Sequence, residues 1–86
     1  MAGIVKNNNK YLVNGRWRIP DGMTAKYVQE VKNVKTLSYT RQLKDSVQLA
    51  YNTGRKLQLF VRPNTYMTAP LREAIITHGI KVTYLW

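Results

Sequence analysis

The chain contains no cysteine and only one histidine, His78. Without cysteine it can form neither a disulfide nor a zinc–thiolate site. A ribonuclease mechanism that needs two histidines is also excluded. No apolar run approaches the roughly 20 residues that a membrane-spanning helix requires. The first residues, Met1 to Lys6, lack the basic start and long apolar core of a secretory signal peptide.

Acidic residues are also scarce, and this leaves the chain strongly basic. Fourteen Lys and Arg residues against four Asp and Glu residues give a formal net charge of +10. Such an excess attracts polyanions, so nucleic acid, an anionic membrane surface and an acidic protein are the candidate partners. A hydrophobic content of 44% over 86 residues supports one core. We therefore expect a single domain over residues 1–86.

The residue pattern predicts the order β-β-β-α-β-α-β, and hence an α/β fold with a small mixed sheet and flanking helices. Residues 1–9 are expected to be a lead-in, with the core over residues 10–86. A first helix is predicted from a cap at Ser38 to a stop at residues 52–54, and a second from a cap at Thr68 to residues 78–79. Alternation and turn signals predict strands at residues 11–13, 16–19, 26–34, 57–62 and 80–85.

Two of the four acidic residues lie close to a lysine near the third predicted strand. Glu30 and Lys32 are two residues apart, so they share one face of a strand. Asp21 belongs to a Pro-Asp-Gly turn, which can fold its carboxylate back beside Glu30. Such oxygen ligands suit Mg²⁺ or Mn²⁺, which can polarise a phosphate and activate a water. Lys32 could orient that water; alternatively, the three residues form a structural ion pair on a surface strand.

The order Pro20-Asp21, spacer, Glu30-Val31-Lys32 resembles the PD-(D/E)XK signature of restriction-endonuclease-like nucleases. The residues at 37–43 and 61–63 extend this resemblance. Together with them, the chain from about residue 14 onward is similar to the restriction-endonuclease-fold toxin domains at the C-terminus of bacterial polymorphic toxins. The resemblance implies a Mg²⁺-dependent endonuclease acting on DNA or RNA. It implies Asp21, Glu30 and the Val31 carbonyl as metal ligands, with Lys32 and Gln42 as further catalytic residues.

The same resemblance implies a biological setting. The parent would be a secreted or contact-delivered toxin that acts in the cytoplasm of a target cell. Its partner would be an acidic immunity protein that complements the basic surface. Relatives begin with a helix that is apparently absent before Tyr11, so an upstream segment or a second copy exchanging elements could complete the fold. Some relatives carry a tyrosine four residues after Gln42, where this chain has Ser46.

Other residues admit both a functional and a structural interpretation. Asp45 is expected to form an exposed ion pair with Arg41 or Lys44. Gln42 could face solvent, and Trp17 could stack on a base, although a hydrophobic anchor is the simpler explanation. Arg62 could bind a phosphate or form a salt bridge. The candidates for contacts to the nucleic-acid backbone are Lys35, Arg41, Lys44 and Arg62.

The sequence leaves two alternatives to a nuclease function open. A non-catalytic nucleic-acid-binding domain predicts metal-independent, strongly salt-dependent binding without cleavage. A basic module that binds an acidic protein predicts tight pairing with that protein and weak affinity for nucleic acid. No base-reading motif is present that would distinguish DNA from RNA.

Overall fold

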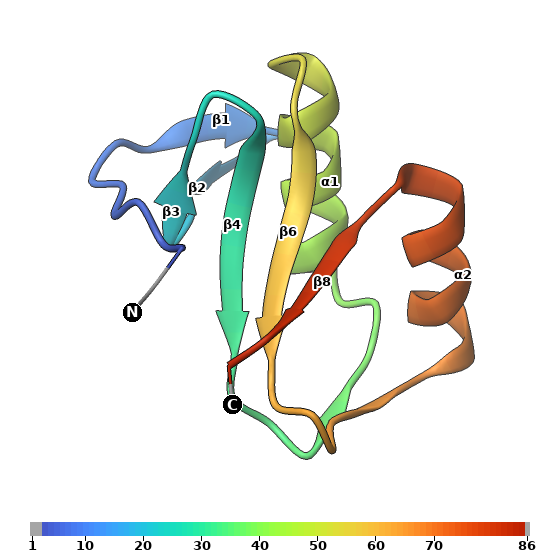
Figure 1. Cartoon of the computed structure of the whole chain (residues 1–86). Coiled ribbons are helices and arrows are strands. Elements are labelled where there is room, and N and C mark those ends of the chain that lie inside the picture. Colours follow the sequence, from blue (N-terminus) through green and yellow to red (C-terminus); the bar gives the residue numbers. More distant parts are fainter. Residues whose placement is uncertain (1–2, 86) are drawn as a thin grey trace.

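The computed structural model describes residues 3–85, in which a four-stranded sheet carries two helices on one face (Figure 1). The strand order is β3–β4–β6–β8; β3 is antiparallel to β4, while β4, β6 and β8 run parallel. The strands are β3 (Gly22–Met23), β4 (Tyr27–Lys32), β6 (Lys56–Val61) and β8 (Lys81–Tyr84). The helices are α1 (Arg41–Asn52) and α2 (Ala69–His78). Neither helix of the described chain is long and apolar enough to cross a membrane.

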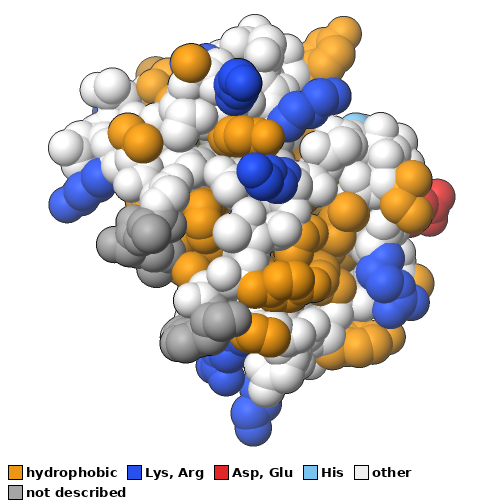
Figure 2. All heavy atoms as spheres, in the orientation of Figure 1, with side chains coloured by type: hydrophobic (Ala, Val, Ile, Leu, Met, Phe, Trp, Pro, Cys, Tyr) orange, Lys and Arg blue, Asp and Glu red, His pale blue; other side chains and the backbone are white. Residues whose placement is uncertain are grey.

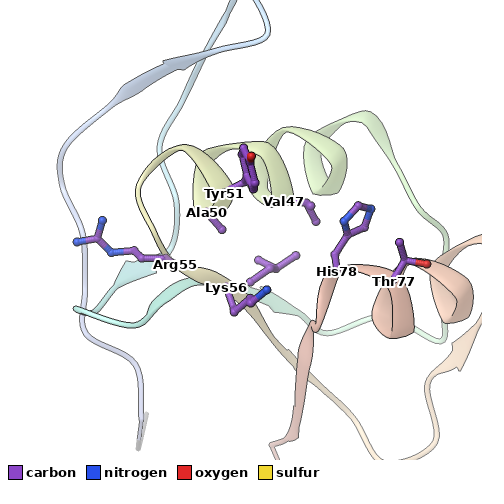
Figure 3. Close-up of a pocket in the computed structure, with 8 residues that line it drawn as sticks. Val47, Ala50, Tyr51, Arg55, Lys56, Thr77 and His78 are labelled. Atoms are coloured by element: carbon purple, nitrogen blue, oxygen red, sulfur yellow. The ribbon is translucent and has the colours of Figure 1, made fainter.

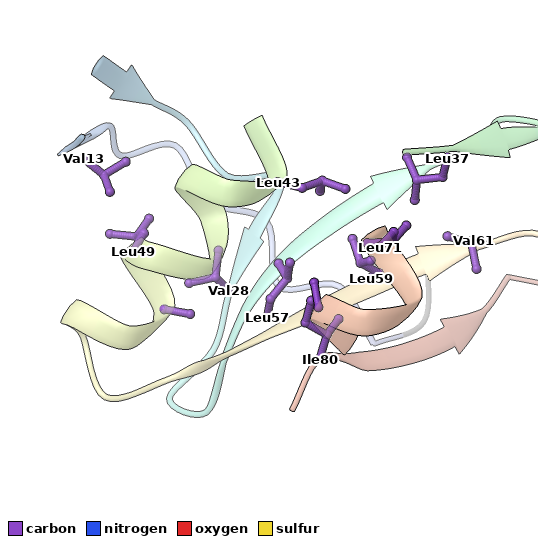
Figure 4. Close-up of a cluster of buried hydrophobic side chains, with 12 residues drawn as sticks. Val13, Val28, Leu37, Leu43, Leu49, Leu57, Leu59, Val61, Leu71 and Ile80 are labelled. Carbon is purple, nitrogen blue, oxygen red and sulfur yellow. The ribbon is translucent and has the colours of Figure 1, made fainter. Parts of the chain in front are cut away.

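Both helices cover the same side of the sheet. The crossovers β4–α1–β6 and β6–α2–β8 step across the sheet in one direction, and right-handed connections then place both helices on one face. Because side chains alternate along a strand, Val28 of β4 faces these helices, and so do Glu30 and Lys32. The hydrophobic core fills this space, and it includes Val28, Leu43, Leu49, Leu57, Leu59, Val61 and Leu71 (Figure 4).

Two small sheets accompany the main one. Strands β1 (Tyr11–Val13) and β2 (Arg16–Arg18) form the predicted hairpin. Both of its turn residues have positive φ, 51° at Asn14 and 77° at Gly15, as a type I′ turn requires. Strands β5 (Thr36–Leu37) and β7 (Tyr66–Met67) form a parallel pair. The pattern did not predict β3, β5 or β7, because a two-residue strand is too short to show alternation.

The α/β class is confirmed, while several element boundaries differ from the prediction. Strand β1 has the predicted bounds, β4 is shorter than predicted, and β2, β6 and β8 differ from the prediction by one residue at one or both ends. The cap of α1 is Thr40, not Ser38: its Oγ1 accepts a hydrogen bond from the Leu43 amide at 3.3 Å. Thr68 holds the cap position of α2 but makes no side-chain cap bond. Helix α2 ends as predicted at Gly79, which adopts the left-handed conformation with φ 62°.

Residues 3–10 pack against the sheet edge at β3. The Met23 amide donates to the Val5 carbonyl at 2.9 Å, and the Val5 amide donates to Gln29 Oε1 at 3.0 Å. Gly22 allows this close approach, because a Cβ there would lie 2.8 Å from the Val5 oxygen. Residues 3–10 contain no helix. They protect the backbone groups of β3 that an uncovered edge would leave unpaired.

Candidate active site

Asp21 and Glu30 meet at the end of the β3–β4 pairing. The register that pairs Gly22 with Gln29 places Asp21 opposite Glu30. The Asp21 amide donates to Glu30 Oε1 at 3.4 Å, and the Val31 amide donates to Asp21 Oδ2 at 2.8 Å. Glu30 is 3% exposed, whereas Asp21 faces solvent. The structure thus brings the two carboxylates together, one buried and one open to water.

Lys32 lies beside this pair on the same face of β4 and reaches helix α1. Its Nζ donates to Gln42 Oε1 at 2.5 Å. Gln42 belongs to the first turn of α1 and is half-buried. Its amide therefore points into the site and not to solvent. This contact holds the ammonium group on the face of β4 that carries Glu30, although Lys32 and Glu30 form no salt bridge within 4 Å.

Ser46 is a site residue that sequence reasoning did not identify. Its hydroxyl donates to Glu30 Oε2 at 2.7 Å and lies 3.0 Å from the Gln42 carbonyl oxygen. It follows Gln42 by four residues, so both project from one face of α1. That spacing was a signal that could have found it. The identity of its partner was not visible, because Glu30 belongs to a different element.

Burial raises the pKa of Glu30 above its ordinary value of 4.5. The hydrogen bond from Ser46 acts in the opposite direction, and the nearby charge of Asp21 raises the pKa further. The protein therefore holds a carboxylate where its charged form is disfavoured. A bound cation between Asp21 and Glu30 would relieve this cost.

We expect Glu30→Gln to stabilise the protein at neutral pH. Because the folded state raises the pKa of Glu30, ionisation destabilises the fold progressively as pH rises through and above 4.5. Glutamine lacks this charge, and the Ser46 hydroxyl can rotate to accept from the new amide. A gain of about 1 kcal/mol would raise Tm by about 4–8 °C. Thermal unfolding of both proteins between pH 4 and pH 8 should show a difference that grows with pH; an equal Tm at pH 8 would contradict this explanation.

Basic side chains lie near the carboxyl ends of β4 and β6. Lys35, Arg41 and Lys44 are exposed. Arg62 follows β6, and its guanidinium donates to the side-chain and main-chain oxygens of Asn33. Among residues 3–85 it makes no salt bridge, so that alternative for Arg62 is not supported. These four side chains sit around the loops that follow the two central strands.

The prediction for Asp45 was wrong, because this residue is fully buried and does not pair with Arg41 or Lys44. Asp45 accepts hydrogen bonds from Arg16 at 2.7 and 2.8 Å, from Arg18 at 2.8 Å and from Asn14 at 2.9 Å. The hydrogen bonds from Arg16 hold the pKa of Asp45 well below its ordinary value. This Asp45 cluster (Asn14, Arg16, Arg18 and Asp45) fastens the hairpin to α1, next to Ser46.

Trp17 is not the hydrophobic anchor of the hairpin. It is 60% exposed, and Lys10 Nζ lies 5.0 Å from its ring centroid. The opposite face of the hairpin carries the anchor instead: Val13 is buried and lies beside Leu49 of α1 in Figure 4. The side chain of Trp17 is consequently free to contact another molecule.

A cavity lies elsewhere, between the two helices near the start of β6. It has a volume of about 260 Å³ and is lined by basic side chains, including Arg55, Lys56 and His78 (Figure 3). None of its lining residues is acidic. The cluster at Asp21, Glu30 and Lys32 combines carboxylates with a cation, and we therefore take it as the candidate active site.

Comparison with known proteins returns one family. The model described as restriction endonuclease fold toxin 7 matches residues 2–71. This range contains the whole candidate active site, from Asp21 to Ser46. No curated protein and no solved structure shows a significant match.

Proposed function

This chain belongs to the restriction endonuclease fold toxin 7 family and is therefore a nuclease toxin domain, and we propose that it hydrolyses phosphodiester bonds in DNA or RNA with Mg²⁺ or Mn²⁺. The observation that carries the proposal is the convergence of two carboxylates and one ammonium group. Asp21 contacts Glu30 through its amide, and Lys32 shares the face of β4 with Glu30. A domain that only binds nucleic acid has no need to bury one carboxylate beside another.

The oxygen atoms at this site suit a small divalent cation. Within residues 3–85 no group of three or more His, Asp or Glu side chains is placed to hold one metal ion. The acidic ligands of the proposed site are therefore the two carboxylates of Asp21 and Glu30. The Val31 carbonyl is a third candidate, because it points to the same side of β4 as its amide, which bonds Asp21. Pro20, opposite Val31 in the extended register, has no N–H to donate to that carbonyl. Mg²⁺ retains waters and binds substrate phosphates at its other positions.

Each neighbouring side chain has a role in this chemistry. A bound metal would polarise the scissile phosphate and lower the pKa of the attacking water. Lys32, positioned by Gln42, would orient that water or offset negative charge on the phosphate. Ser46 would fix Glu30 so that its Oε1 stays directed towards Asp21. The nucleic-acid backbone would contact the basic residues near the site, namely the exposed Lys35, Arg41 and Lys44 and the half-buried Arg62.

We also propose the partner and the setting. Of the four acidic residues, Asp21, Glu30 and Asp45 belong to the candidate site or to the Asp45 cluster, and Glu73 is the exposed one outside them. In Figure 2, Lys and Arg side chains are spread over the visible face, and acidic side chains appear only at its edge. An acidic immunity protein would complement this surface. The parent would be a secreted or contact-delivered bacterial toxin, and two copies could exchange elements.

The test is a cleavage assay with the purified chain. Plasmid DNA and total tRNA would each be incubated with wild type in Mg²⁺ and in EDTA, and with Glu30→Gln in Mg²⁺. We expect cleavage of at least one substrate by wild type in Mg²⁺, and none in EDTA or with the variant. Cleavage that persists in EDTA would exclude the metal mechanism. Binding of both substrates without cleavage by any sample would support the non-catalytic binding domain instead.

A further inference from the structure

The outer side of the β1–β2 hairpin leads directly to Asp21. Exposed and covered residues alternate from β2 into β3, with Trp17, Ile19 and Asp21 facing solvent. The residues between them are turned inward: Arg16 and Arg18 bind Asp45, while Pro20 and Gly22 are buried. Side chains two apart on an extended chain project to the same side. Trp17 and Ile19 therefore share the exposed side of the hairpin, and Asp21, a proposed metal ligand, follows Ile19 by two residues, within about 13 Å of Trp17 along the chain.

This row is apolar and has a positive charge beside it. Trp17 is 60% exposed and Ile19 62%; Leu12, the cross-strand partner of Trp17, is 59% exposed. Lys10 Nζ lies over the Trp17 ring. We call Lys10, Leu12, Trp17 and Ile19 the hairpin surface. Grouped apolar side chains that face water at one place commonly mark a binding surface.

We propose that the hairpin surface binds unpaired bases of the substrate strand, with Trp17 as the stacking platform. The proposal rests on the proposed nuclease function and extends it to the form of the substrate. Aromatic rings next to basic side chains are how proteins hold single strands, because the rings stack on bases and the cations contact phosphates. Lys10 is the cation here. Four extended residues span at most about 13 Å, so Asp21 lies within about four nucleotides of Trp17 at the spacing of about 3.4 Å in a stacked strand.

The hairpin is also suited to this role by its rigidity. The Asp45 cluster ties the inner face of the hairpin to α1, so the outer face is held in place before any ligand arrives. A preorganised surface loses little conformational entropy on binding. The same tie places the hairpin beside the helix that carries Gln42 and Ser46 (Figure 1). A protein partner could cover an apolar surface, but the direct continuity with Asp21 favours the substrate strand.

The experiment measures binding without cleavage, in EDTA. Wild type, Trp17→Ala and Tyr51→Ala would be titrated with labelled oligothymidine and oligouridine strands, and with an oligo(dA)·oligo(dT) duplex, by fluorescence anisotropy. Tyr51 is the matched control, since it is 80% exposed and lies in the last turn of α1, outside the hairpin surface. In a Trp86→Phe background, quenching of Trp17 fluorescence by the strand would report stacking.

We expect Trp17→Ala to weaken binding to at least one single strand about tenfold, which corresponds to the loss of one stacked base. Binding to the duplex should change by less than about twofold, and Tyr51→Ala should bind like wild type. Unchanged binding of both strands by Trp17→Ala would overturn the proposal, and so would an equal loss on the duplex or in Tyr51→Ala. Because EDTA removes the metal, these affinities do not depend on cleavage. A failure of the stacking proposal can therefore be distinguished from a failure of the proposed nuclease function.

Discussion

Replacing Lys32 with methionine is expected to lower the rate of phosphodiester cleavage by about 100- to 1,000-fold while leaving the fold intact. The ammonium group is held by Gln42 at 2.5 Å and shares a strand face with Glu30, so it is in place before the substrate binds. A preorganised charge of this kind stabilises the transition state more than the ground state. Methionine keeps most of the side-chain volume and removes only the charge and its hydrogen bond.

The measurement is the single-turnover rate in Mg²⁺, with the substrate that the wild type cleaves. Lys26→Met is the matched control, because Lys26 is an exposed lysine just before the opposite end of β4. It removes the same charge from the protein, so a general electrostatic effect on binding would slow both variants alike. We expect Lys26→Met to stay within about threefold of wild type. Similar rates for the two variants would remove Lys32 from the proposed mechanism.

Replacing Asp45 with alanine is expected to destabilise the fold by about 3 kcal/mol. Asp45 is fully buried, and its loss would leave two arginines facing each other without the carboxylate that joins them. Small domains are stable by only about 5–15 kcal/mol, so this loss would be a large share of the total. Equilibrium unfolding in urea measures it directly. Because Asp45 is buried while Arg16 and Arg18 are partly exposed, added salt should reduce the difference only in part.

Glu73→Ala supplies the control for Asp45→Ala. Glu73 is exposed on α2, so its removal should change stability by less than about 0.5 kcal/mol. The pH dependence provides an independent check. Because the folded state lowers the pKa of Asp45, its contribution is complete above the ordinary value of 3.8 and is lost as pH falls below that value. The two variants should therefore converge in strongly acidic solution, and equal stabilities at pH 7 would contradict the role of Asp45.

The part of the site that could be predicted depends on residues close together in the chain. Glu30 and Lys32 required only the alternation of a strand, and Asp21 required one turn. Gln42 came from a family resemblance. These local rules predicted the arrangement of Asp21, Glu30 and Lys32 correctly. The helices cover the face of β4 that carries Glu30 and Lys32, and a purely structural role explains charged residues on a covered face poorly.

Other features depended on contacts that spacing does not encode. Asp45 looked like a surface residue between Lys44 and Ser46, because its partners lie 27 to 31 positions earlier in the chain. Alternation in the hairpin was correct, but it could not show which face α1 would cover, and so Trp17 was assigned to the wrong environment. Ser38 and Thr40 are equally good caps in sequence. The β5–β7 pairing holds the preceding residues extended, and the helix starts only after Thr40.

The central position of β6 has a consequence for how this protein folds. Strand β6 is paired in parallel on both sides, and each partner is reached only through a helical crossover. Pairings between segments far apart in sequence form slowly, whereas the turn that joins β3 to β4 is local. We expect Asp21 and Glu30 to become neighbours early, while the contacts from α1 to Glu30 and Lys32 wait for the sheet to assemble. Early in refolding, Asp21 and Glu30 would already be neighbours. The chain would still be inactive as a nuclease, because Gln42 and Ser46 of α1 would not yet contact Lys32 and Glu30.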